Sequence, residues 1–251
     1  MTTTYLPITG LPVGEVSPAV IVCGDPARAD RIAERLEGGV LLSHKREYRA
    51  HRGSFGGRAI TVCSHGIGAP GAAAAFEELI AGGARRIIRV GTCGGLQPDI
   101  QPGHLIVATA AVQNTGYGRE VVPDGYPAAA DPDLTHHLWQ NVSGMGATSG
   151  HSGRRGYVLT RDSFYAGVAV PAAPDYREMS RAGVLAVEME CAALFLVGAL
   201  RNVATAAILV ADGNVLATGE SMDTYSPGNE IVQRAVDAAA LCALETLAEV
   251  R

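Results

Sequence analysis

The sequence predicts an α/β fold, a single domain whose central mixed, largely parallel β-sheet is flanked by helices. Apolar strand-like runs alternate with stretches of helical spacing, which is typical of a sheet covered on both faces. Glycine-rich segments follow several of these runs, at the carboxyl ends of strands where such sheets bind ligands. The chain has 251 residues, of which 47% are hydrophobic and 18% charged, so we expect residues 1–251 to form one domain around a substantial core.

Strands are expected where apolar residues run unbroken between turn residues. These runs cover residues 20–23, 58–63, 85–90, 104–109, 184–187 and 205–210. Helices are expected where apolar residues recur at helical spacing, or where alanines accumulate before a glycine pair. They cover residues 27–36, 72–81, 191–200 and 229–250. Residues 113–135, rich in Gly, Pro and Asp, predict a long loop or interface arm, and residues 213–228 predict a second loop placed to act as a lid.

Charge and cysteine content argue against several classes of protein. The net charge is −5 without a basic stripe, so no nucleic acid is expected as a partner. The five cysteines are widely spaced and form no CxxC pair, which predicts reduced, buried thiols. No signal-peptide pattern and no apolar run near the ~20 residues of a membrane span occur, so a cytoplasmic protein without membrane contact is expected. Neither a metal-ligand cluster nor a dinucleotide fingerprint occurs, so no metal is expected.

The segment Arg89–Gly95 is predicted to bind an anion. It begins within a strand-like run, and its glycines predict a tight turn. Arginine offers a planar set of donors that matches phosphate oxygens, and Thr92 adds a hydroxyl. Because Arg89 lies in a buried-looking strand, its charge must meet either a ligand or a structural carboxylate.

A second arginine-bearing turn, Gly24–Arg28, ends the first apolar run and has two interpretations. In one, Asp25 and Pro26 cap a helix and leave Arg28 exposed. In the other, an anion binds at the glycine N–H and the helix N-terminus, and Arg28 closes over it. Two such turns at the ends of two strands suggest one pocket that holds one oxyanion.

Several other ionisable side chains follow or interrupt apolar runs. Glu188 and Glu190 would lie on the same side of an extended segment, either as acceptors for the vicinal hydroxyls of a sugar or as acids favoured by a helix N-terminus. Asp212 is either a cap or a partly buried acid that donates a proton to a leaving group. His65, in a glycine-rich turn, is expected to be structural. Arg46 belongs to a basic cluster that is either a solvated surface or part of a site.

Together these segments resemble the nucleoside phosphorylase family that contains the hexameric purine nucleoside phosphorylases and the uridine phosphorylases. The resemblance covers nearly the whole chain and looks closest to the 6-oxopurine-preferring purine enzymes. The segments that carry it are Gly24–Arg28, Arg46–Tyr48, Ser64–Gly68, Phe76–Leu79, Arg89–Gly94, Ser163–Tyr165, Val187–Glu190 and Val210–Asp212. The resemblance implies reversible phosphorolysis, in which nucleoside and orthophosphate give free base and pentose 1-phosphate. Orthophosphate is then a co-substrate, and no cofactor is implied.

The resemblance also implies which residues bind phosphate and ribose, and that subunits share their sites. The phosphate-binding residues would be Gly24, Arg28, Arg89 and Thr92. Arg46 would reach the phosphate of a neighbouring subunit, which requires a dimer and fits a hexamer built as a trimer of dimers. Met189 and Glu190 would hold the ribose. Tyr5 would take the place of an N-terminal histidine that this sequence lacks.

For the base, the resemblance implies contacts from Phe164, Tyr165 and Glu188, with Asp212 as the catalytic acid that protonates N7 of a purine. Uridine-specific members carry Gln-x-Arg just after the Phe-Tyr pair, whereas residues 167–170 here are Gly-Val-Ala-Val. We therefore favour inosine and guanosine as substrates. A uridine or broad-specificity phosphorylase is the alternative. A nucleosidase, whose members lack the phosphate arginines, and a non-catalytic nucleoside-binding protein are the other hypotheses.

Overall fold

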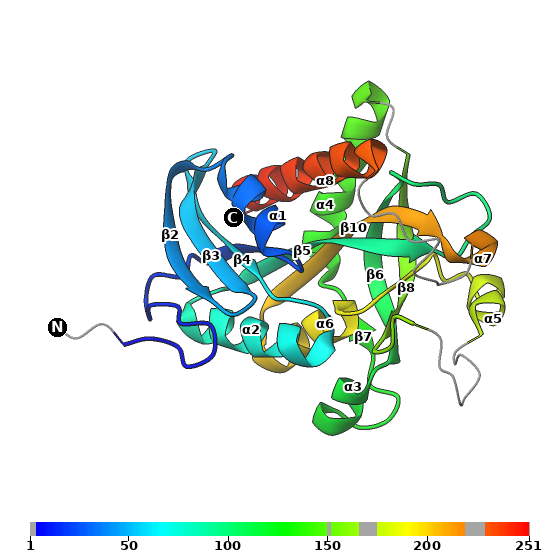
Figure 1. Cartoon of the computed structure of the whole chain (residues 1–251), viewed down its shortest axis with the longest axis horizontal. Helices are drawn as coiled ribbons and strands as arrows, with labels where there is room; N and C mark the ends of the chain where they lie inside the picture. The colour runs from blue at the N-terminus through cyan, green and yellow to red at the C-terminus, as the bar shows by residue number, and fades with distance from the viewer. Residues whose placement is uncertain (1–3, 150–151, 166–174, 219–228, 251) are drawn as a thin grey trace.

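The computed structural model describes residues 4–149, 152–165, 175–218 and 229–250. Its centre is a ten-stranded mixed β-sheet with helices on both faces (Figure 1), which confirms the predicted α/β class. The strands are β1 (Ala19–Cys23), β2 (Glu37–Lys45), β3 (Tyr48–Phe55), β4 (Arg58–Ser64), β5 (Arg86–Gly95), β6 (Leu105–Asn114), β7 (Ala128–Ala129), β8 (Gly153–Arg161), β9 (Ala186–Glu188) and β10 (Ala204–Asn214). The helices are α1 (Pro26–Ala33), α2 (Ala69–Gly82), α3 (Gly116–Val121), α4 (Pro132–Ser149), α5 (Tyr176–Arg181), α6 (Cys191–Arg201), α7 (Val215–Thr218) and α8 (Glu230–Glu249).

Alternate residues of the central strands pack against opposite layers of helices. In β1, Val20 and Val22 belong to the core formed with α2 and α6, whereas Ile21 and Cys23 belong to the core formed with α1, α4 and α8 (Figure 1). Every residue of β1 is buried. A strand buried on both faces has no polar alternation, which is why these strands stand out in the sequence as unbroken apolar runs.

The central strand β5 borders an opening in the sheet. On one side, β10 pairs with it in parallel from Arg86 to Gly95. On the other side, β1 pairs only with Arg86 to Arg89, and β9 pairs only with Gly94 and Gly95. Within the described part of the chain, residues 90–93 therefore have no strand partner on that side. This opening lies at the carboxyl end of β1, the kind of crevice in which α/β sheets bind ligands.

The segment Arg89–Gly95 is part of β5, so the prediction of a tight turn there is wrong. None of its glycines has a positive φ. The glycines instead leave room for neighbouring side chains. A Cβ on Gly94 would lie only 2.6 Å from Val215 Cγ1, and a Cβ on Gly95 only 2.7 Å from Ile100 Cγ2. Glycine within a strand can mark such a close approach of neighbouring groups, and here it does.

Other differences from the prediction occur where strands lack an apolar run or lie at an edge. Residues 113–135, predicted as a long loop, contain the end of β6, α3, β7 and the start of α4. The hairpin β2–β3 and strand β8 were not predicted. The side chains of β2 are mostly exposed, so this strand carries no hydrophobic signal of a buried element. In the predicted loop 213–228, β10 continues to Asn214 and α7 to Thr218, and residues 219–228 lie outside the described residues.

All five cysteines are buried free thiols, as predicted. Burial raises the pKa of the Cys23 thiol to about 12, so the reactive thiolate is scarce at neutral pH. Among the described residues, the helices are too short or too polar to cross a membrane.

Candidate active site

A cavity of about 760 Å³ lies at the opening between β1 and β9. Most of the predicted site residues line it, although they come from distant parts of the chain. Those residues are Gly24, Arg28, Arg89, Thr92, Phe164, Glu188, Met189, Glu190 and Asp212. Arg46, Tyr5 and Tyr165 do not line the cavity of this single subunit. The sheet therefore gathers the phosphate, ribose and acid positions predicted from the sequence into one place.

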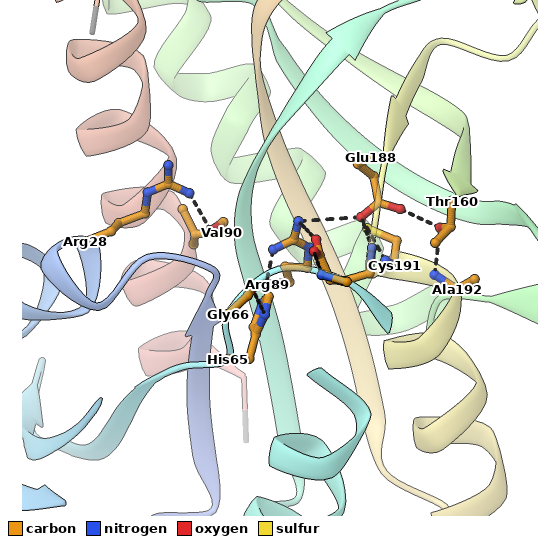
Figure 2. A network of polar contacts seen from close by, with 11 residues as sticks. Arg28, His65, Gly66, Arg89, Val90, Thr160, Glu188, Cys191 and Ala192 are labelled. Carbon is orange, nitrogen blue, oxygen red and sulfur yellow. Dashed lines mark hydrogen bonds and ion pairs between the residues drawn. The ribbon is translucent and has the colours of Figure 1, made fainter. Parts of the chain in front are cut away.

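The turn after β1 contains the helix cap of one interpretation and the inward-pointing arginine of the other. Asp25 caps α1 by accepting a hydrogen bond from Ala27 N (2.9 Å), and Pro26 stands in the first turn. Arg28 nevertheless points inward, where its Nη1 donates to the carbonyl oxygen of Val90 at 3.3 Å (Figure 2). Burial lowers the pKa of Arg28, with a further contribution from Arg89, yet its ordinary value is so high that the guanidinium stays charged. Within the described residues its buried Nε makes no hydrogen bond, which leaves a donor for a ligand.

Arg89 forms the centre of a buried polar network (Figure 2). Its Nη2 donates to Glu190 Oε2 at 2.5 Å and approaches Glu188 Oε2 at 3.5 Å, while Nη1 lies 3.1 Å from His65 Nε2. Burial acts to lower the pKa of Arg89, but Glu190 and Glu188 outweigh it, so the pKa is raised. Its charge thus meets structural carboxylates. Its buried Nε makes no hydrogen bond within the described part of the chain.

The two glutamates have different partners. Glu188 accepts hydrogen bonds from Glu190 N (2.7 Å) and Cys191 N (2.8 Å) at the start of α6, and from the Thr160 hydroxyl (Figure 2). This is the helix N-terminal role considered for it, and the residue also borders the cavity. Glu190 accepts from Gly68 N at 2.6 Å. Burial raises the pKa of Glu190, and the ion pair with Arg89 opposes this rise.

Asp212 owes its position to an irregularity in β10. Ala211 is opposite Cys93 and Gly213 is opposite Gly94, so Asp212 is an extra residue in the β10–β5 register. Such a bulge redirects a side chain out of the regular alternation. Asp212 is half-buried and lines the cavity beside the opening. The bulge thus brings the residue predicted to be the proton donor to the cavity.

The remaining predicted residues lie at or beyond the rim. Phe164 packs edge-to-face against Tyr165, with ring centroids 5.1 Å apart, and only Phe164 lines the cavity. Tyr5 is 61% exposed and pairs with Pro12 in an isolated bridge. Arg46 is exposed at the tip of the β2–β3 hairpin, in a left-handed conformation with φ of 58°.

Two residues of the site were not assigned to ligand binding from the sequence. His65 is fully buried, its Nδ1 is 2.9 Å from the carbonyl oxygen of Gly66, and burial together with Arg89 lowers its pKa, in keeping with the expected structural role. Arg161 is buried in the cavity wall at the end of β8. A signal for it existed: it follows the short apolar run Val158-Leu159 after a single threonine, much as Arg89 follows Ile87-Ile88.

A crevice in a mixed sheet, lined by the half-buried Arg28, the buried Arg89 and a carboxylate pair, is typical of α/β enzymes that bind an anionic ligand. The chain belongs to the phosphorylase superfamily, which it matches over residues 18–248. It is 34% identical over 229 residues to the guanosine phosphorylase of Halorubrum lacusprofundi, covering 89% of this chain and 91% of the relative. It is 36% identical over 215 residues to the uridine phosphorylase of Treponema pallidum, covering 82% and 81%. The resemblance stated from the sequence is confirmed.

Solved structures show the same kinship. A purine nucleoside phosphorylase from Toxoplasma gondii in complex with immucillin-H superposes with a TM-score of 0.90 and 32% identity, over 99% of this chain and 97% of that one. A uridine phosphorylase from Vibrio fischeri superposes with a TM-score of 0.84 and 35% identity, over 98% of both chains. The fold and family are thus common to relatives named for purine nucleosides and for uridine.

Proposed function

We propose that the protein catalyses the reversible phosphorolysis of purine nucleosides, with inosine and guanosine favoured, to free base and ribose 1-phosphate. The observation that supports this most directly is that the buried Nε atoms of Arg28 and Arg89 have no partner among the described residues. The two arginines line one cavity together with Glu190 and Asp212. A dianion bound there would satisfy both donors and stand beside the groups proposed for ribose and base.

The strand order supports a phosphate–ribose–base arrangement along the cavity. Gly24 and Arg28 follow β1, Thr92 lies in β5, Glu190 follows β9, and Phe164 follows β8. Neighbouring strands are about 4.8 Å apart, so the distance from β1 to β8 across β5 and β9 is roughly 14 Å, comparable to a nucleoside with an attacking phosphate. Glu190 would accept the 2′ and 3′ hydroxyls, and Arg89 would hold its carboxylate in position.

Each proposed role follows from the charge that develops during the reaction. Breaking the glycosidic bond places positive charge on the ribose, and the adjacent phosphate stabilises this charge and then attacks C1′. The departing purine needs a proton at N7, which Asp212 would donate. We propose that orthophosphate is the only further reactant and that no cofactor takes part.

The competing functions make different demands on the same site. A uridine phosphorylase would share the phosphate and ribose groups, and relatives of both kinds match this chain. Residues 167–170, where uridine-specific members carry Gln-x-Arg, lie outside the described residues. A nucleosidase would not need Arg28 and Arg89 in the cavity. A non-catalytic nucleoside-binding protein would not need an acid at Asp212.

One assay separates these functions. Inosine, guanosine, adenosine and uridine are each incubated with the protein, with and without orthophosphate, and base release is measured. We expect phosphate-dependent release of hypoxanthine and guanine, because the arginines bind the nucleophile and Asp212 protonates a purine. Turnover of uridine alone would contradict the purine assignment. Equal rates without phosphate would indicate hydrolysis, and no turnover of any nucleoside would favour the binding protein.

We further propose that Arg46 completes the phosphate site of a neighbouring subunit, in a dimer that is the unit of a hexamer. Its exposure at a hairpin tip, away from its own cavity, supports this role. The variants Arg46→Ala and Asp212→Asn are each expected to lose most activity. When both chains are co-refolded in equal amounts, half of the dimers would be mixed, and each mixed dimer would have one intact site, restoring about a quarter of wild-type activity. If Arg46 served its own subunit, mixing would restore nothing.

A further inference from the structure

Arg161 is a buried cation in the cavity wall that the proposed phosphorolysis does not use. It ends β8, only 3% of its surface is exposed, and it lines the cavity together with Ser163 and Phe164. A guanidinium donates hydrogen bonds and accepts none, and it keeps its charge at any physiological pH. Its presence beside a ligand cavity therefore favours ligand groups that are acceptors.

Tyr176, the first residue of α5, orients this guanidinium. The Arg161 Cζ lies 5.4 Å from the centroid of the Tyr176 ring, and Nη1 donates a hydrogen bond to the tyrosine hydroxyl. The cation–π contact and the hydrogen bond together oppose rotation of the guanidinium away from this position. A side chain held in this way can discriminate between ligands, because its donors point in set directions.

The pairing of strands places Arg161 at the end of the cavity away from the phosphate arginines. β8 pairs with β9 in parallel, with Thr160 opposite Glu188, so Arg161 stands one residue further on, level with Met189. β9 in turn pairs with β5, which puts β8 two strands, or roughly 10 Å, from the strand of Arg89. Phe164 follows β8 at the same end. This end is where the base lies in the proposed function.

We propose that Arg161 is a specificity-determining residue that donates hydrogen bonds to the exocyclic oxygen of the base, so that the site selects oxo bases over amino bases. The proposal rests on the proposed nucleoside substrate. At the same ring position inosine presents a carbonyl acceptor and adenosine an amino donor, and only the acceptor pairs with a guanidinium. Arginine reads guanine in the same way, through its O6 and N7 acceptors. The positive charge also stabilises the negative charge that the departing base acquires.

The test compares Arg161→Met with a matched control, Arg155→Met. Arg155 lies on the same strand, with its guanidinium carbon 5.5 Å from the Trp139 ring centroid, but it is exposed and outside the cavity. We expect Arg161→Met to lower the ratio of kcat/KM for inosine to that for adenosine by about 10- to 100-fold, the range typical of one arginine–base contact. Arg155→Met should leave the ratio unchanged. Equal losses for both nucleosides in Arg161→Met would overturn the proposal.

A binding measurement keeps this test separate from the test of phosphorolysis. Calorimetry measures the affinity of the protein for two pairs of bases, hypoxanthine with adenine and uracil with cytosine. The wild type is compared with Arg161→Met and Arg161→Lys, and the lysine variant serves if the methionine variant does not fold. The wild type is expected to prefer the oxo base of at least one pair, and both variants should reduce that preference. Loss of phosphorolysis with the preference intact would refute only the proposed reaction. A wild type without any oxo preference, or variants that retain it in full, would refute the role of Arg161.

Discussion

Arg89→Met is expected to lower kcat/KM for orthophosphate by roughly 10- to 10²-fold, because the charge-assisted hydrogen bond from the Arg89 Nε to the anion would be lost. The same change should destabilise the protein by about 3–5 kcal/mol, since it leaves a buried carboxylate without its partner. That carboxylate belongs to Glu190, which is 2.5 Å from Arg89 Nη2. Initial rates at varied phosphate concentration and urea-induced unfolding measure the two effects.

Two further variants separate the two effects. In Arg89→Met/Glu190→Gln the unpaired buried charge is gone, so most of the lost unfolding free energy should return while phosphate use stays low. Arg86→Met removes an arginine from the other end of β5, outside the cavity, and should leave phosphate kinetics unchanged. An Arg89→Met enzyme with wild-type kcat/KM for phosphate would show that Arg89 serves only to balance the two glutamates.

Asp212→Asn is expected to reduce kcat for inosine by about 10²- to 10⁴-fold, the contribution typical of a general acid. An amide cannot supply the proton that N7 of the departing purine requires. The KM for phosphate should change little, because Asp212 is not among the residues proposed to bind the anion. Asp99→Asn is the control: Asp99 is an exposed acid that pairs with Arg154 at the surface. Steady-state rates of inosine phosphorolysis measure the effect.

A substrate that needs no proton distinguishes acid catalysis from a structural role of Asp212. In 7-methylguanosine N7 is already alkylated and the purine carries a positive charge, so it can leave unassisted. The Asp212→Asn enzyme should therefore cleave 7-methylguanosine at close to the wild-type rate. If both nucleosides lose activity equally, Asp212 shapes the site rather than donating a proton. If inosine turnover is unchanged, it has neither role.

Local sequence predicted the cap at Asp25 and the inward arginine at Arg28 as alternatives, and the structure contains both. They do not exclude each other, because Asp25 satisfies the helix N-terminus while Arg28, almost one turn on, reaches Val90 of β5. From the sequence, the cap and the inward arginine looked like alternatives because the sequence does not show which strand lies beside α1.

The partners of Arg89 also could not be predicted from local sequence. The sequence required an anion for Arg89, and it placed Glu188 and Glu190 on one side of an extended segment. It did not show that these residues meet across 99 and 101 positions of chain. Nor did it show that Glu188 binds the start of α6 while Glu190 holds the ion pair.

Local sequence was enough to predict the α/β class, the buried strands and the residue types of an anion site. These follow from apolar runs and from the cost of burying a charge, and both are local properties. Three features became visible in the folded chain alone: β5 continues through its glycines, Asp212 stands on a bulge, and Arg161 enters the cavity wall. Each depends on a contact that the local sequence pattern does not reveal: Val215 and Ile100 against the glycines, β5 against β10, and Tyr176 against Arg161.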